Sequence, residues 1–397
     1  MAALCLSTTL LPARAQTRAQ AANDGDCRIA NWPQYRVFLK HFVQHDGRVL
    51  DASTPKLHSS SEGQSYGMFF ALVANDAASF EKIWRWAVNN LAKGDVGSNL
   101  PAWLWGLNDR NQWTVIDPNP ASDAELWFIY SLLEAGKRWQ RADYLRDAAA
   151  LLALVEAHEV DDLPGLGKML LPWPRHLVRE DRIWRLNPSY HPLFLLRRLA
   201  AESPHGPWRD IISNTVRMLR TVSPKGFAPD WVGYQADGAG KGRFVLDPEK
   251  QDIGSYDAIR VYLWAGLTAP EDPLAPTIAN MLHGMADATR KTAAPPEIVH
   301  TMTGVTENTG PFGFSAALVP YFHLRKETDL MQAQYSRAIA LWQASLDGKP
   351  EENRQPPYYD HMLCLFSTGW QQGHYRFLPN GSLQLPSETP CPHATTR

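Results

Sequence analysis

The sequence of 397 residues lacks the features that mark several classes of protein. It has no run rich in lysine and arginine, and its formal net charge is −2, so the electrostatic footprint of a nucleic-acid-binding protein is absent. No segment after the N-terminal stretch offers the roughly 18 apolar residues that would cross a bilayer. None of the four cysteines stands in a Cys-x-x-Cys spacing, which argues against a thiolate zinc site. We therefore expect no nucleic-acid partner, no membrane span, no metal and no cofactor.

Two further patterns match only part of a known metal-binding or catalytic motif. His41 and His45 have the i,i+4 spacing of metal ligands, but the glutamate of H-E-x-x-H is missing, so a solvated helix face explains them better. Ser315 lies in a sequence similar to a nucleophile elbow. The last glycine is absent and no strand is expected before it, which argues against serine hydrolase chemistry.

The first fifteen residues have features of an export signal. They hold a short apolar stretch and end in Ala13-Arg14-Ala15, an A-x-A cleavage pattern, although the basic segment of a complete signal peptide is missing. The alternative is the irregular N-terminus of a cytoplasmic protein. We predict an incomplete signal peptide over 1–15, one catalytic domain over 16–390 and a tail over 391–397, in a periplasmic or secreted protein.

Apolar residues recur with a period near 3.6 in about a dozen segments, which predicts about twelve helices in an all-α fold. Short connections between them indicate antiparallel helix pairs. Such pairs form a closed ring or an α-solenoid, and no fixed-period repeat favours the solenoid. Short strands are expected at 112–116 and 375–377. The predicted helices lie roughly at 32–44, 63–75, 79–93, 122–139, 141–158, 189–201, 207–222, 255–267, 273–289, 312–323, 327–346 and 356–371.

Three carboxylates stand at the expected beginnings of helices, each after a long connection. They are Glu62 in a segment rich in serine and glycine, Asp123 in Ala-Ser-Asp-Ala-Glu, and Asp257 three residues before Arg260. In a ring of helices such ends converge on one face. That arrangement supplies the separated acid and base that hydrolysis of a glycosidic bond requires.

A purely structural explanation stays open for each of these carboxylates. Ser59 with Glu62, and Ser61 with Gln64, both fit a capping box at a helix N-terminus. Ser122 or Asp123 can cap the helix that follows them. Asp257 and Arg260 share one helical face and can form an ion pair there.

Aromatic residues in the long connections are candidates for contact with sugars, because the flat C–H face of a sugar packs on a ring. Trp103 and Trp105 lie two residues apart, so they face the same way if the segment is extended. Trp184, Tyr190 and Trp231 lie in later connections. Packing in the core is the alternative for all five.

Four of these blocks, taken in order, resemble glycoside hydrolase family 8, and within it the endo-1,4-β-glucanases (cellulases) encoded with bacterial cellulose synthase. The resemblance extends roughly from Cys27 to Cys391. It implies an (α/α)6 barrel with short strand insertions in the long loops, an inverting mechanism, a β-1,4-glucan substrate and a periplasmic role beside the cellulose synthase machinery. The blocks are Ser61–Met68, Pro101–Gly106, Asn187–Tyr190 and Ser255–Arg260.

The resemblance also implies roles for individual residues. Glu62 matches the general acid, Asp257 the general base, and Asp123 a residue that binds the sugar at the cleavage site. Tyr190 matches a residue that helps to hold the attacking water. The remaining substrate-binding candidates are Tyr66, Trp103, Trp105, Trp184, Trp231 and Arg260.

One position departs from the family signature, which usually has aspartate where this chain has Glu125. Asp123 itself still matches the family signature, but the signature no longer defines the side chains that pack behind Asp123. Two other functions stay open: a non-catalytic guide for a glucan chain, or a xylanase or chitosanase of the same fold. A guide needs aromatic side chains more than acidic ones, so retention of all three carboxylates argues against it.

We predict a disulfide between Cys27 and Cys391 in the exported protein. The two residues flank the globular part near its ends, and an exported protein can join such ends, whereas Cys364 lies in an apolar run and is expected as a free, buried thiol. Closing so long a loop contributes about 4–5 kcal/mol in the chain-entropy model. Mass spectrometry of unreduced peptides tests the pairing, and two free thiols in periplasmic material would contradict it.

Overall fold

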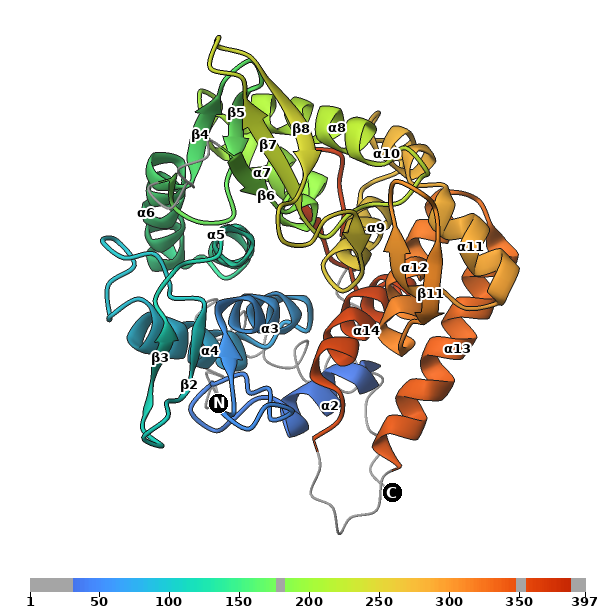
Figure 1. The fold of residues 1–397 in the computed structure, drawn as a ribbon. Coiled ribbons are helices and arrows are strands. Elements are labelled where there is room, and N and C mark those ends of the chain that lie inside the picture. Colours follow the sequence, from blue (N-terminus) through green and yellow to red (C-terminus); the bar gives the residue numbers. More distant parts are fainter. Residues whose placement is uncertain (1–30, 176–182, 348–354, 387–397) are drawn as a thin grey trace, which may run out of the picture.

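The computed structural model describes residues 31–175, 183–347 and 355–386. Six helices of this part form an inner ring, in which each helix contacts the next and the last contacts the first (Figure 1). The ring is therefore closed, and a solenoid is excluded. Its members are α3 (Ser61–Val73), α5 (Ser122–Arg138), α7 (Leu193–Glu202), α9 (Ala258–Leu267), α12 (Phe312–Leu324) and α14 (Tyr358–Gln371).

An outer layer of helices surrounds the ring, and every inner helix pairs with an outer helix (Figure 1). The pairs are α3 with α4, α5 with α6, α7 with α8, α9 with α10, α12 with α13, and α14 with α2; α11 contacts α13. Six pairs around one axis make the predicted (α/α)6 barrel. The outer helices are α2 (Pro33–His41), α4 (Ala77–Leu91), α6 (Ala142–His158), α8 (Trp208–Val222), α10 (Ala275–Met281), α11 (Gly284–Thr292) and α13 (Thr328–Leu346).

The sequence of each layer reflects its surroundings. The inner helices α3 and α12 are apolar around most of their circumference because neighbours cover them on all sides, whereas the outer helix α8 is amphipathic. Rings from four inner helices meet at the centre of the barrel. Trp127 lies 5.0 Å from Phe69, 5.1 Å from Phe366 and 5.4 Å from Trp264, measured between ring centroids. Each such pair adds about 0.5–1.5 kcal/mol beyond the area that it buries.

The helix predicted over 273–289 is wrong in one respect, because the chain forms two helices there, α10 and α11. The break lies at Leu282 and His283. The amide of Gly284 donates to the carbonyl of Gly226 at 2.9 Å, a partner outside the helix. A side chain at Gly284 would come within 2.4 Å of the Lys225 carbonyl oxygen, so the loop before β7 packs directly on the interruption.

The long connections carry short strands in small antiparallel sheets. The strands expected near 112–116 and 375–377 are present as β3 and β12, and the other strands were not predicted. The sheets are β1 (Ser59–Ser60), β2 (Leu104–Leu107) and β3 (Trp113–Asp117); β4 (Val160–Leu163) and β5 (Gly167–Leu170); β6 (Ile183–Leu186), β7 (Val232–Ala236) and β8 (Gly242–Leu246); β9 (Ile253–Gly254), β10 (Pro296–His300) and β11 (Thr306–Thr309); β12 (Arg376–Phe377) and β13 (Leu383–Gln384).

The remaining expectations about the chain are tested only in part. Within the described residues, no helix combines the length and the apolar character that crossing a membrane requires. Cys364 is a free thiol, 1% exposed, as predicted. Cys27, Cys391 and the predicted boundaries at 15 and 390 lie outside the described residues, so the disulfide and the domain limits stay predictions.

Candidate active site

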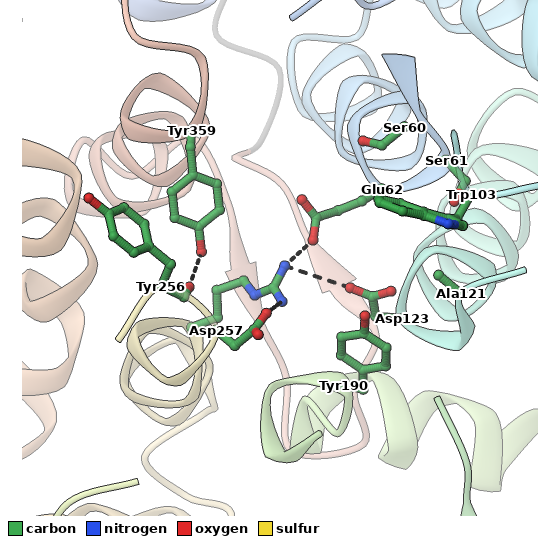
Figure 2. Close-up of a pocket in the computed structure, with 11 residues that line it drawn as sticks. Ser60, Ser61, Glu62, Trp103, Ala121, Asp123, Tyr190, Tyr256, Asp257 and Tyr359 are labelled. Carbon is green, nitrogen blue, oxygen red and sulfur yellow. Dashed lines mark hydrogen bonds and ion pairs between the residues drawn. The ribbon is translucent and has the colours of Figure 1, made fainter. Parts of the chain in front are cut away.

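A pocket of about 260 Å³ opens where the inner helices begin, and the three predicted carboxylates point into it (Figure 2). Glu62 lies in the first turn of α3, Asp123 in the first turn of α5, and Asp257 immediately before α9. The beginnings of the helices therefore converge as the sequence indicated. The lining residues are Ser60, Ser61, Glu62, Trp103, Ala121, Asp123, Tyr190, Tyr256, Asp257, Arg260 and Tyr359.

Arg260 joins the three carboxylates. Its Nη1 contacts Glu62 Oε2 and lies 3.7 Å from Asp123 Oδ2, while its Nη2 lies 2.7 Å from Asp257 Oδ1 and donates to Ser189 Oγ at 3.0 Å. Burial of the guanidinium opposes its charge, but the surrounding carboxylates, Glu62 first, raise the pKa of Arg260 well above its ordinary value. The pocket thus contains a permanent cation. The pair between Asp257 and Arg260 was predicted, and the contacts with the other two carboxylates were not.

Glu62 does not cap its own helix, so neither of the capping boxes that the sequence allowed is formed. The hydroxyl of Ser60 accepts from the amide of Gly63 at 3.0 Å and caps α3 instead. The Gln64 side chain is buried and donates to the carbonyls of Gly47 and Ile83. Because Ser60 satisfies the helix end, the carboxylate of Glu62 is free to point into the pocket.

Asp123 is almost fully buried, and its Oδ1 accepts from the amide of Ala124 at 2.9 Å. Neither Ser122 nor Asp123 forms the predicted cap of α5, which begins after Ala121 without a side-chain cap. Burial and the charge of Glu62 raise the pKa of Asp123 well above its ordinary value. The nearby guanidinium of Arg260 acts in the opposite direction and lowers the pKa of Asp123.

Asp257 is the most exposed of the three, with 31% of its side chain accessible to solvent. Trp231 Nε1 donates to Asp257 Oδ2 at 2.9 Å, so both carboxylate oxygens have a partner within the protein. Each oxygen keeps a second lone pair. Asp257 can thus accept a proton from water while its orientation stays fixed.

The aromatic candidates divide into two groups. Trp103 and Tyr190 line the pocket, and Trp103 is 39% exposed. The Ser61 amide donates to the Trp103 carbonyl at 2.9 Å, which places Trp103 beside the beginning of α3. Trp231 reaches the site through its hydrogen bond to Asp257 and does not itself line this pocket.

Tyr66, Trp105 and Trp184 do not line the pocket. Tyr66 is 2% exposed and packs in the aromatic core, and Trp184 Nε1 donates to Asp161 Oδ2 at 3.0 Å. Trp105 stacks on Trp113 with ring centroids 5.0 Å apart. The expectation that Trp103 and Trp105 face the same way required an extended segment, and the chain instead bends at Trp103, before β2 begins.

Two aromatic lining residues were missed from the sequence, Tyr256 and Tyr359. The Tyr359 hydroxyl donates to the Tyr256 carbonyl at 2.5 Å and joins the beginnings of α14 and α9 (Figure 2). Tyr359 could have been found by the same rule as the carboxylates, because it also stands at the beginning of an inner helix. Among the described residues, no group of three acidic, histidine or cysteine side chains could hold a metal ion.

Comparison with known proteins decides the family. A model of the glycosyl hydrolases family 8 matches residues 7–373. The chain belongs to this family. An endoglucanase of Pseudomonas fluorescens (strain SBW25) is 48% identical over 377 residues, 93% of this chain and 94% of that protein. An endoglucanase of Escherichia coli (strain K12) is 42% identical over 352 residues, 89% of this chain and 90% of that protein.

Solved structures agree with this assignment. The endo-1,4-D-glucanase from Vibrio fischeri ES114 is 36% identical, covers 89% of this chain and 99% of its own, and superposes with a TM-score of 0.80. The endo-beta-1,4-glucanase CMCax from Acetobacter xylinum is 26% identical, covers 88% and 99%, and gives a TM-score of 0.68. The protein is a family 8 glycoside hydrolase of the endoglucanase class.

Glu125, at the position that departs from the family signature, lies in a layer behind Asp123 together with Glu159. Both are completely buried, and no side chain among the described residues forms a hydrogen bond or ion pair with either carboxyl. Burial, together with the charge of Glu159, raises the pKa of Glu125 well above its ordinary value. Burial and Asp123 raise the pKa of Glu159 in the same direction. This family 8 enzyme therefore favours uncharged carboxyls behind its pocket.

Glu125→Gln should remove part of the pH dependence of stability. Because the pKa of Glu125 is raised in the folded state, the fold retains a proton that the unfolded chain releases above about pH 4.3, so the free energy of unfolding falls as pH rises, by up to about 1.4 kcal/mol per pH unit. Glutamine carries no charge in either state. In urea unfolding between pH 4 and 8, the free energy of unfolding of the variant should increase relative to that of the wild type as pH rises.

The matched control for this comparison is Glu271→Gln, at an exposed position. This variant should follow the wild type across the whole range. Parallel curves for Glu125→Gln and the wild type would show that the fold does not favour the protonated form of Glu125.

Proposed function

We propose that the protein hydrolyses internal β-1,4-glucosidic bonds of cellulose with inversion at the anomeric carbon, with Glu62 as general acid and Asp257 as general base. One observation carries the proposal: the two terminal nitrogens of Arg260 contact Glu62 on one side and Asp257 on the other. The relatives named endoglucanase and endo-1,4-D-glucanase support the substrate.

The proposed inversion rests on the resemblance to family 8, and the separation of Glu62 and Asp257 is the geometric quantity that bears on it. An inverting pair leaves room for a water molecule, with its carboxyls about 6.5–9.5 Å apart, whereas a retaining pair is closer. Glu62 and Asp257 contact different terminal nitrogens of Arg260, so each carboxylate has its own partner on the guanidinium. Their side chains are 22% and 31% exposed, so both reach solvent or substrate in the pocket.

The proton transfers follow from these positions. Water attacks the anomeric carbon while Asp257 accepts its proton, and Glu62 donates a proton to the glycosidic oxygen as the bond to the leaving sugar breaks. Asp257 ends protonated and Glu62 ends charged. Exchange with solvent returns both to their starting states.

Three neighbouring residues complete the proposed site. Asp123, which lies in the first turn of α5 and lines the pocket, holds a hydroxyl of the sugar at the cleavage point. Burial raises the pKa of Tyr190 well above its ordinary value, which keeps its phenol protonated and able to orient the attacking water. Trp103 offers the exposed ring for stacking on a neighbouring sugar.

The cellular context proposed for this activity is the periplasm or the exterior of a bacterium, in association with cellulose synthesis. The supports are the A-x-A pattern near Ala15 and the resemblance to endoglucanases encoded with cellulose synthase. A glucan chain emerging from a synthase presents internal β-1,4 bonds. An endo-acting hydrolase with an accessible pocket can reach such bonds.

Side-by-side assays on carboxymethylcellulose, xylan and chitosan should show hydrolysis of the first substrate above the other two. Internal cleavage shortens chains quickly, so solution viscosity should fall long before many reducing ends accumulate. Reducing-end release and viscosity are both measured on each polymer. Faster hydrolysis of xylan or chitosan would contradict the proposed substrate, and release of reducing ends without loss of viscosity would contradict endo action.

Glu62→Gln and Asp257→Asn should each lower kcat by at least about 10²-fold, the range for loss of a general acid or base. Both amides keep an oxygen for Arg260, so the melting temperature and the affinity for cello-oligosaccharides should stay near those of the wild type. Glu271→Gln removes an exposed carboxylate outside the pocket lining and is the control, with wild-type turnover expected. Retention of more than a tenth of kcat in either site variant would contradict its assigned role.

A further inference from the structure

Asp230 is a buried carboxylate beside the site that does not line the pocket. It is 5% exposed, and its Oδ1 accepts from three backbone amides: Ser255 at 2.7 Å, Asp257 at 3.1 Å and Ala258 at 2.7 Å. Its own amide donates to the Ile253 carbonyl at 2.8 Å. Asp230 therefore fixes the whole turn that carries Asp257 into α9.

This contact supplies the cap that α9 lacks. The first amides of a helix have no partner within the helix, and the residue at the N-cap usually satisfies one of them with its own side chain. Asp257 occupies the N-cap of α9, yet its side chain makes no capping hydrogen bond. Asp230 performs the capping from another loop, which leaves the Asp257 carboxylate free for the pocket.

The next residue along the chain, Trp231, holds the side chain of Asp257. Its Nε1 donates to Asp257 Oδ2 at 2.9 Å. The indole is fixed in turn, because it stacks on Trp173 with ring centroids 5.5 Å apart and the Arg185 guanidinium lies 4.7 Å from its ring. Arg185 is itself anchored by the fully buried carboxylate of Asp247 at 2.6 Å.

We propose that Asp230 and Trp231 are positioning residues for the general base: Asp230 fixes the backbone of Asp257, and Trp231 fixes the rotation of its carboxylate. The inference rests on the proposed role of Asp257. With Oδ1 held by Arg260 and Oδ2 held by Trp231, the plane of the carboxylate is set, and so is the direction from which water is activated. A catalytic group has to be held within a fraction of an ångström of its productive position, and a displacement of 1 Å can cost about 10²-fold in rate.

The test compares Asp230→Ala with Asp230→Asn. The alanine variant loses the acceptor, and its kcat should fall by about 10²-fold with KM within about twofold of the wild type, because water activation and not substrate binding is disturbed. The asparagine variant keeps an Oδ1 acceptor and should retain kcat within about threefold. An asparagine variant as impaired as the alanine variant would overturn the assignment, as would a change confined to KM.

A matched capping residue outside the pocket separates positioning from general stability. Asp76 caps α4 through the Ser79 amide at 3.0 Å, so Asp76→Ala should lower the melting temperature without lowering kcat. If Asp230→Ala lowers kcat no more than Asp76→Ala does, the inference is wrong.

Trp231→Phe tests the second contact and serves if the alanine variant does not fold. It keeps a ring for stacking on Trp173 and loses the N–H, so kcat should fall about tenfold, the scale of one hydrogen bond to a charged group. Unchanged kcat would overturn the positioning role of Trp231. Asp257→Asn separates failure of the proposed function from failure of the positioning role. Full turnover in Asp257→Asn would contradict the assignment of Asp257 as the base. An inactive Asp257→Asn beside a fully active Trp231→Phe would contradict only the positioning role of Trp231.

Discussion

The contact of Arg260 with three carboxylates is the interaction on which this active site depends. Three acidic side chains gathered in a partly desolvated pocket repel one another, and each is costly to bury without a partner. One guanidinium compensates for that cost, because it contacts Glu62 and Asp257 and lies 3.7 Å from Asp123. The (α/α)6 barrel makes this possible, because it brings the beginnings of α3, α5 and α9 to one place.

A second constraint is that the carboxylates of the proposed acid and base must not cap the helices that carry them. A carboxylate at the beginning of a helix is drawn to the free amides there, which would remove it from the pocket. In this protein another residue caps each of the two helices concerned: Ser60 caps α3 beside Glu62, and Asp230 caps α9 beside Asp257. The helix ends thus keep their favourable electrostatics for anions while the proposed acid and base remain available.

The sequence predicted the features that depend on local pattern. Periodicity gave nearly all the helices, including the inner helix α12, and the carboxylates were placed correctly at the beginnings of helices. Features that depend on contacts between distant segments were not predictable. The break at Gly284 depends on Gly226, and the cap of α9 depends on Asp230. The separation of Trp103 from Trp105 depends on a bend at Trp103, whose backbone bonds to Ser61 and Asn119. Tyr66 shows the same limit, since only the packed barrel reveals that it belongs to the core.

The central claim is that water held by Asp257 displaces the leaving sugar in a single step while Glu62 protonates it. A single displacement inverts the anomeric carbon, so a β-1,4 bond must give an α product at the moment of cleavage. Proton NMR during the first minutes of hydrolysis of a cello-oligosaccharide, before mutarotation mixes the anomers, measures this directly. The account predicts the α anomer as the first product at the new reducing end, and a β anomer formed first would contradict it.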